Sequence, residues 1–457
     1  MSRLARAIFA ATGLAVTIVL AAIITGSRNI VEAARDPRPN IVVVMTDDQY
    51  NTTVKDMPYT NSRPDWARFS NAMVNTALCA PSRSTFLTGQ TSTHTGIESN
   101  SETQDFKNHS TIADWLDDSG YQTGYVGKYL NKFPWDEPET YVPSGWDYWS
   151  GYSGPETYFN FTLNQNGALT DYAGPKNYST DVLSDQAVDF INTANPKRPF
   201  FEFVAYNAPH SPWTPPKRYA DKQVRPIKET AAFLEKNVRD KPKWIQQSHT
   251  PPIKKLREDR IKHNQAILAV DDGVEQIFDA LEARGELDNT IVIFTTDHGI
   301  SIGEHRYNKK TCGYEVCSRV PLLIRGPGVT PGAVKGVVGN IDMAPTIADY
   351  AEIKTGKPVD GRSIRPLLDG RKKTLHQDVL LRRAQGQGER IFWGLRTDRY
   401  KYVHYTRTDE KELYDLKRDP EELFNLMSTK RKHWRQVAHD LDDQLERMRK
   451  IEPQVRR

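Results

Sequence analysis

The sequence has few cysteines, little net charge and no internal repeats. Its three cysteines allow at most one disulfide within the chain, and its formal net charge at pH 7 is only +4. Neither a helix-turn-helix nor an aromatic RNA-binding motif is present, so nucleic acid is excluded as the expected partner. No long low-complexity tract interrupts the 457 residues, and 38% of them are hydrophobic, which excludes a disordered chain.

The excess positive charge is unevenly placed along the chain. Residues 217–262 hold 14 Lys or Arg against 6 Asp or Glu, a local excess of +8. Such a run is either a solvated surface insertion or a rim that attracts a polyanion, and the sequence leaves both interpretations open.

The pattern of apolar residues divides the chain into two parts. From residue 40 to about residue 368, strand and helix patterns alternate, which predicts an α/β fold for residues 38–370. One helix is expected over 260–284, with the Asp271-Asp272 pair on a solvated or salt-bridged face. Residues 376–457 combine short alternating runs, typical of antiparallel strands, with an amphipathic pattern near the end, so we expect a smaller C-terminal α+β subdomain.

Four apolar runs end in polar residues. The run 40–46 is β-branched without alternation, as in a strand buried on both faces, and it ends in Asp47 and Asp48. The other three runs lead to Lys128, to Asn207 with His210, and to Asp297 with His298. In an open α/β sheet the ligand site lies beyond the carboxyl ends of the strands, so we expect these groups to share one crevice. Carboxylates gathered there would repel one another without a cation, and hard oxygen ligands favour Ca²⁺ or Mg²⁺.

The stretch from Cys79 to Gly89 reads Cys-Ala-Pro-Ser-Arg-Ser-Thr-Phe-Leu-Thr-Gly. It matches the C-x-P-S-R-x-x-x-L-T-G signature of type I sulfatases, and the chain therefore resembles this family. The resemblance implies an alkaline phosphatase-like fold, with a large mixed, mostly parallel sheet sandwiched by helices. It also implies that Cys79 is oxidised to formylglycine (3-oxoalanine), so a formylglycine-generating enzyme is an expected partner during maturation.

A hydrated aldehyde suits a sulfate ester better than an ordinary thiolate or hydroxyl does. An ordinary nucleophile would leave a stable sulfated enzyme after attack on sulfur. The hydrated aldehyde carries two hydroxyls on one carbon, so one attacks sulfur and the other loses its proton and expels sulfate. The alternative, a small buried structural cysteine before a proline, is disfavoured by six further matching positions.

The resemblance also implies a set of metal ligands. One divalent ion, Ca²⁺ or alternatively Mg²⁺, is expected to be held by Asp47, Asp48, modified Cys79, Asp297 and His298. A solvated Asp-Asp pair that caps a helix is the alternative for the first two residues.

Four further side chains correspond to positions that contact substrate or nucleophile in the family. The resemblance implies that Arg83 contacts the hydrated aldehyde, that Lys128 bridges nucleophile and sulfate, and that His210 lies close to the ester oxygen. Fixed cations of this kind stabilise negative charge that develops in the transition state. Lys310 corresponds to the family's sulfate-binding lysine, but the adjacent Lys309 stays open as an alternative.

The segment Gly127-Lys128-Tyr129-Leu130-Asn131 resembles the N-acetylglucosamine-6-sulfatase branch of the family. Many arylsulfatases have a histidine at the position of Leu130. The branch and the basic insertion together make a glycan with 6-O-sulfated glucosamine units the expected substrate. His298 departs from this branch, which commonly has asparagine there, whereas iduronate-type sulfatases use histidine.

The first 34 residues predict a targeting segment. Arg3 and Arg6 precede an apolar run over residues 7–25, and small residues near position 33 suit a signal peptidase. The run is long for a signal peptide and near the lower limit for a membrane-spanning helix, so cleavage and retention as an anchor both stay open. We expect an exported protein that is secreted, periplasmic, lysosomal or anchored to the outer face of a membrane.

Export permits disulfides. With Cys79 consumed by oxidation, Cys312 and Cys317 remain as the expected pair, which would close a short loop beside Lys310.

Two other classes of function share parts of this pattern. An arylsulfatase or a phosphonate monoester hydrolase of the same superfamily would share the metal site and can share the formylglycine. A non-catalytic glycan-binding protein would share only the scaffold, and the filled nucleophile, metal and lysine positions argue against it.

Overall fold

An eleven-stranded sheet forms the centre of the computed structural model, which describes residues 36–375, 378–384 and 390–452. The strand order is β11-β2-β10-β8-β1-β7-β3-β4-β5-β6, with β9 beside β2. Strands β8, β1, β7, β3 and β4 pair in parallel, whereas β10, β5 and β6 pair antiparallel with their neighbours. The bounds are β1 Asn40–Thr46, β2 Ala67–Met73, β3 Gln122–Gly127, β4 Tyr148–Tyr152, β5 Phe161–Gln165, β6 Ala168–Tyr172, β7 Phe200–Ala205, β8 Thr290–Thr296, β9 Arg319–Val320, β10 Leu322–Arg325 and β11 Gly332–Gly339.

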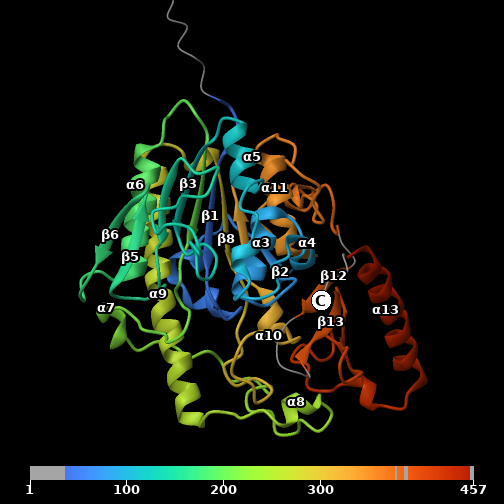
Figure 1. Cartoon of the computed structure of the whole chain (residues 1–457). Helices are drawn as coiled ribbons and strands as arrows, with labels where there is room; N and C mark the ends of the chain where they lie inside the picture. Colours follow the sequence, from blue (N-terminus) through green and yellow to red (C-terminus); the bar gives the residue numbers. More distant parts are fainter. Residues whose placement is uncertain (1–35, 376–377, 385–389, 453–457) are drawn as a thin grey trace, which may run out of the picture. The chain divides into compact units, whose positions relative to one another are not determined.

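Helices cover both faces of this sheet (Figure 1). Alternate residues of β1 belong to different hydrophobic cores: Ile41 and Val43 lie on one side, and Val42 and Val44 on the other. The first core includes α3 (Cys79–Thr88), α5 (Ile112–Asp118) and α11 (Met343–Tyr350), and the second includes α6 (Ser179–Thr193) and α9 (Ile253–Ala283). This burial on both faces explains the uninterrupted apolar run of β1. The predicted α/β fold is confirmed.

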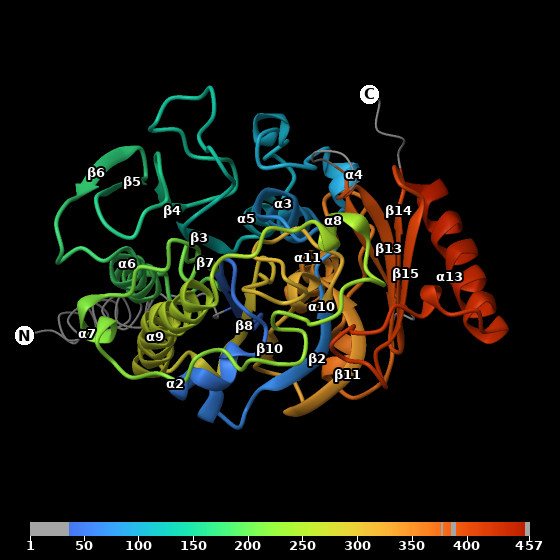
Figure 2. The same ribbon diagram turned by 90° about the horizontal axis from the view of Figure 1, so that it is seen from below.

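A second, antiparallel sheet follows near the C-terminus. Its strands are β12 (Asp378–Arg383), β13 (Phe392–Thr397), β14 (Tyr400–Tyr405) and β15 (Glu410–Asp415). Figure 2 shows α13 (Lys432–Ile451) along one side of this sheet, where Trp434, Leu441 and Leu445 enter a small core with Leu395 and Leu413. The predicted C-terminal α+β subdomain is therefore present, with β12 as a strand that the alternating pattern did not predict.

Short helices complete the architecture. They are α2 (Pro58–Ser62), α4 (Ser92–Thr95), α7 (Lys217–Ala220), α8 (Lys243–Gln246), α10 (Glu315–Ser318) and α12 (Arg365–Leu368).

The long helix α9 differs from the prediction in two respects. It begins at Ile253 rather than at residue 260. The Asp271-Asp272 pair also divides: Asp272 forms the expected salt bridge, 2.8 Å from Arg218, but Asp271 is buried. Its carboxylate accepts the N–H groups of Tyr59 and Thr60, both at 2.8 Å, and so satisfies the first turn of α2.

Ion pairs within the protein neutralise part of the basic insertion, residues 217–262. Arg257 pairs with Glu229 at 2.6 Å, and the fully buried Lys241 lies 3.7 Å from Glu235. Some of the cations of this segment are therefore paired with acidic side chains of the protein itself. Others, including Lys217 and Lys236, are exposed.

The two cysteines beside the predicted sulfate-binding lysine form the expected bridge. Cys312 and Cys317 are disulfide-bonded, and Cys79 is the free cysteine. The predicted targeting segment, residues 1–34, lies outside the described residues. Among the helices that the structure describes, none combines the length and the apolar character needed to cross a membrane.

A buried acid in β7 generates a test of stability. Glu202 is fully buried, and neither of its carboxyl oxygens has a hydrogen-bond partner among the described residues. Burial raises its pKa well above the ordinary value.

We expect Glu202→Met to raise the free energy of unfolding at pH 8 by about 1–3 kcal/mol, the cost of a buried unsatisfied polar group. Between the ordinary pKa and the raised pKa, the folded state holds a proton that the unfolded state releases, so Glu202 stabilises the fold less as pH rises. The gain, measured by urea denaturation, should be larger at pH 8 than at pH 5. Glu202→Gln, which cannot ionise, should remove the pH dependence with a smaller gain, and a Met variant less stable than wild type at both pH values would contradict this account.

Candidate active site

The stretch from Cys79 to Thr88 forms the helix α3, and Cys79 is its first residue. The side chain of Cys79 is fully buried, at the helix N-terminus, where the aligned peptide dipoles favour negative charge. The stretch ends where the helix ends: Gly89 has φ 66°, and its N–H bonds the carbonyl of Thr85 at 2.9 Å. This left-handed conformation explains why glycine closes the motif.

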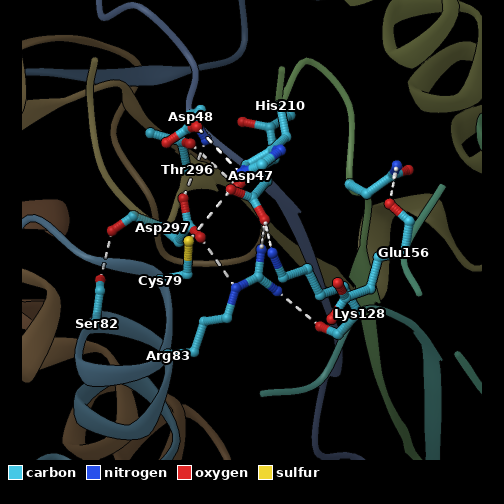
Figure 3. Close-up of polar contacts among 12 residues, drawn as sticks. Asp47, Asp48, Cys79, Ser82, Arg83, Lys128, Glu156, His210, Thr296 and Asp297 are labelled. Atoms are coloured by element: carbon cyan, nitrogen blue, oxygen red, sulfur yellow. Dashed lines mark hydrogen bonds and ion pairs between the residues drawn. The ribbon is translucent and has the colours of Figure 1, made fainter. Parts of the chain in front are cut away.

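The carboxyl ends of β1 and β8 bring three carboxylates together (Figure 3). These strands pair in parallel with Thr46 opposite Thr296, so Asp47 and Asp48 leave one strand beside Asp297 from the other. The N–H of Asp48 donates to Oδ1 of Asp297 at 3.2 Å. The two Asp motifs, 249 residues apart in the chain, therefore form one cluster, as the strand-end argument predicts.

Arg83, one turn along α3 from Cys79, ties this cluster to the helix. Its Nε lies 3.0 Å from Asp297 Oδ2, its Nη2 lies 3.2 Å from Asp47 Oδ2, and its Nη1 donates to the carbonyl of Lys128 at 2.7 Å. The side chain is 2% exposed, so these ion pairs are shielded from water. Arg83 holds the carboxylates in place, and within the described residues its hydrogen bonds go to Asp297, Lys128 and Asp47 rather than to Cys79 Sγ.

Lys128, which follows β3, binds the carboxylate of Asp47. Its Nζ lies 2.5 Å from Oδ2 of Asp47, and the side chain is 3% exposed. The preceding Gly127 has φ 106°, and a Cβ there would come within 2.1 Å of the carbonyl oxygen of Ala205. Glycine is thus required where β3 passes β7 and turns Lys128 into the site.

Lys310 and His210 lie next to Asp48, and Lys310 also lies next to Cys79. Lys310 Nζ lies 2.9 Å from Cys79 Sγ, 3.2 Å from Asp48 Oδ1 and 3.3 Å from His210 Nε2. His210 Nε2 lies 3.5 Å from Asp48 Oδ2, and its Nδ1 lies 2.6 Å from the carbonyl of Ser211. Lys309, by contrast, is exposed, whereas the amine of Lys310 lies beside Cys79.

The charges of the cluster shift one another's protonation. Burial alone would raise the pKa of Asp47, but Lys128, His210 and Arg83 lower it well below the ordinary value. Burial alone would lower the pKa of His298, but Asp297, Cys79 and Asp48 raise it to about 9.

The donor atoms fit a divalent ion. Asp47, Cys79, Asp297 and His298 are all buried, and each offers a ligand atom within 4.8 Å of the others. Asp47, Asp48 and His210 form a second, overlapping group by the same criterion. Oxygen-rich clusters of this kind are typical of hard cations.

All nine predicted site residues therefore converge, and the structure adds one that the sequence did not indicate. His263, on α9, is fully buried behind Asp48, and its Nε2 accepts the N–H of Tyr50 at 3.2 Å. Burial lowers its pKa to about 4, so the ring is neutral near pH 7. In the sequence, His263 is one residue of an amphipathic helix pattern, and nothing in that pattern predicts that it contacts the segment of Asp48 and Tyr50.

A cavity of about 750 Å³ opens from this cluster. Its lining includes Asp48, His210 and Lys310 of the cluster, together with Trp213, Lys255, Glu98, Arg382 and Phe392. Charged groups of the cluster thus share a larger, partly apolar recess, which is typical of a small-molecule site.

Comparison with known families decides the assignment. The sulfatase family matches residues 39–353, and the C-terminal domain of N-sulphoglucosamine sulphohydrolase matches residues 303–451. The chain belongs to the sulfatase family. This confirms the resemblance inferred from Cys79–Gly89, and it assigns the chain to the sulfuric ester hydrolases.

Individual relatives agree with this assignment. N-acetylglucosamine-6-sulfatase of Homo sapiens is 35% identical over 391 residues, which cover 79% of this chain and 69% of that protein. An extracellular sulfatase SULF-1 homolog of Drosophila melanogaster is 33% identical over 383 residues, 78% of this chain, and this sulfatase chain spans only 34% of it. A solved structure in complex with its substrate, D-glucosamine-2-N,6-O-disulfate, has a TM-score of 0.79 at 25% identity and covers 90% of this chain and 98% of its own.

The carboxylate cluster generates a metal-binding prediction. Asp297→Asn should lose most of the bound divalent ion, because one anionic ligand that offsets the ion's charge is removed. Elemental analysis of the purified protein measures this loss, and chelation should lower the melting temperature of the wild type but not of the variant. Asp272→Asn, on the surface of α9, is the matched control and should keep the ion. An active wild-type preparation free of divalent metal would contradict the prediction.

Proposed function

We propose that this sulfatase hydrolyses 6-O-sulfate esters of glucosamine units in a sulfated glycan, with Cys79 converted to formylglycine and with Ca²⁺ as the resident ion. The observation that carries the proposal is the convergence of Lys310, His210 and the carboxylate cluster around Cys79 at the end of one cavity. The names of the human relative and of the bound sugar in the similar structure support the choice of substrate.

The residues that would hold the ion are Asp47, Asp48, position 79, Asp297 and His298. When bound, the ion and the formylglycine would supply a Lewis acid and an aldehyde hydrate that serves as nucleophile.

The remaining side chains would orient the carboxylate of Asp47 and neutralise the charge of the sulfate. Arg83 and Lys128 hold Oδ2 of Asp47 at 3.2 and 2.5 Å, while Oδ1 of the same carboxylate lies 3.7 Å from Cys79 Sγ. One oxygen is thus fixed by cations and the other is aimed at position 79. Lys310 Nζ is 2.9 Å from Cys79 Sγ, so it is placed to bind a sulfate oxygen next to the nucleophile.

His210 is placed to protonate the leaving oxygen. Its Nδ1 lies 2.6 Å from the carbonyl of Ser211, which requires a proton on Nδ1 and leaves Nε2 directed at Lys310 and Asp48. A primary alkoxide is a poor leaving group, so proton transfer from Nε2 would accelerate release of a sugar alcohol.

The compartment and the domain limits are part of the proposal. The disulfide between Cys312 and Cys317 favours an oxidising compartment, and the apolar run over residues 7–25 favours export. We assign residues 38–370 to the catalytic domain and residues 376–457 to the C-terminal subdomain.

The state of Cys79 is the first test. If Cys79 is formylglycine and the other two cysteines are paired, denatured but unreduced protein should contain no thiol that iodoacetamide labels. Peptide mass spectrometry should show an aldehyde oxygen in place of the Cys79 sulfur, and Cys79→Ala should abolish turnover of every sulfate ester. A fully labelled Cys79 in an active preparation would refute the modification.

The proposed role of His210 can be tested by comparing substrates whose leaving groups differ in their need for a proton. His210→Ala should lower kcat on N-acetylglucosamine 6-sulfate by about 100-fold or more, the usual contribution of a general acid, and on 4-nitrophenyl sulfate far less, because phenolate leaves without help. His439→Ala, an exposed histidine on α13, is the control and should change neither. Equal losses on both esters would remove His210 as the acid, and turnover of aryl sulfate without turnover of any sulfated sugar would overturn the substrate class.

A further inference from the structure

The cavity extends beyond the groups that would bind sulfate. With the sulfate held near Lys310, the alcohol part of the substrate must lie against the remaining wall. That wall includes an ion pair, Glu98 with Arg382, to which neither the metal cluster nor the proposed proton transfer assigns a role.

The pair joins two distant parts of the chain beside the nucleophile. Glu98 lies on the loop after α4, two residues before Asn100, whose side chain accepts the N–H of Ala80 at 3.0 Å. Arg382 lies on β12, and its N–H donates to the carbonyl of Asn75 at 2.7 Å, four residues before Cys79. Both residues are therefore anchored to the segment that leads into α3.

Both side chains are rigidly held. Nη2 of Arg382 lies 2.5 Å from Oε1 of Glu98, and its Nη1 donates to Thr93 Oγ1 at 2.7 Å. The guanidinium plane also lies over the ring of Trp393, 4.1 Å from the centroid. The side chains are 10% and 6% exposed, so a ligand would meet them without first ordering them.

The pair also has unused hydrogen-bonding capacity. The Nε of Arg382 is buried without a hydrogen-bond partner among the described residues. Burial raises the pKa of Glu98 despite the neighbouring Arg382, which reflects incomplete solvation of the carboxylate. Buried polar groups of this kind are usually hydrogen-bonded, and both residues line the cavity in which a ligand would lie. A carboxylate beside a guanidinium offers one acceptor and one donor, which matches the hydroxyls of a sugar ring and has no counterpart on an aryl ester.

We infer that the Glu98–Arg382 pair binds ring hydroxyls of the sulfated sugar and thereby selects sugar sulfates over aryl sulfates; this inference rests on the proposed function. The C-terminal subdomain then supplies half of a specificity element, because Arg382 belongs to β12. Each hydrogen bond from a hydroxyl to such a charged group is worth roughly 10- to 100-fold in kcat/KM.

The experiment compares Glu98→Gln and Arg382→Gln with wild type on N-acetylglucosamine 6-sulfate, its 3-deoxy and 4-deoxy analogues, and 4-nitrophenyl sulfate. Each variant should lose roughly 10- to 100-fold in kcat/KM on the intact sugar and stay within about 3-fold of wild type on the aryl ester. On the deoxy analogue that lacks the bound hydroxyl, variant and wild type should differ little, because a contact that is already absent cannot be lost twice.

Arg399→Gln is the matched control, since Arg399 lies in the turn between β13 and β14, pairs with Asp415 at 2.8 Å and does not line the cavity. It should match wild type on every ester. The aryl ester also reports folding, because a variant that fails to fold loses both activities.

Each other outcome counts against the inference. Equal losses on sugar and aryl esters would give the pair a structural role, and no loss on the sugar would remove it from the site. Full, additive losses on both deoxy analogues would rule out hydroxyl contact. If wild type hydrolyses no sulfated sugar, the proposed function fails as well, which separates that result from failure of the inference alone.

Discussion

The guanidinium of Arg83 is the contact on which the site depends. It binds Asp47 after β1, Asp297 after β8 and the carbonyl of Lys128 after β3, while its own helix presents Cys79. Three strand ends and the nucleophile are thus tied to one buried charge. Removing one partner of such a buried network costs about 3–5 kcal/mol, because an uncompensated charge is left behind.

The C-terminal subdomain also helps to position the residues around Cys79. The loop that carries Lys310 is also attached to the C-terminal subdomain, because Arg383 donates to the carbonyl of Thr311 at 2.8 Å and Tyr314 donates to the buried Glu412 at 2.9 Å. Glu315, at the start of α10, lies 2.9 Å from the fully buried Lys401. The disulfide between Cys312 and Cys317 closes the same loop. The small sheet therefore helps to position a lysine of the large domain.

Much of the site could be predicted, because its residues follow strands or lie in one short motif. An apolar run predicts a strand, and the Asp47-Asp48 or Asp297-His298 pair that follows it marks the carboxyl end of that strand. Parallel pairing brings these carboxyl ends together. Asp271 was misinterpreted, since the partner that buries it, the first turn of α2, lies more than 200 residues earlier in the chain. The strand β12 lacked a clear alternating pattern because its residues Val379, Leu380 and Leu381 are buried on both faces.

The sequence by itself determined the motif that begins at Cys79, the carboxylates at the strand ends and the α/β class of the fold, because each follows from consecutive residues or from the period of apolar positions. Only the tertiary structure placed the amine of Lys310 beside Cys79, placed His263 behind Asp48, and paired Glu98 with Arg382. Each of these depends on which way a side chain points, or on contacts between residues more than 200 positions apart. Local propensity and spacing carry no information about such contacts, whereas packing and the pairing of buried charge fix them.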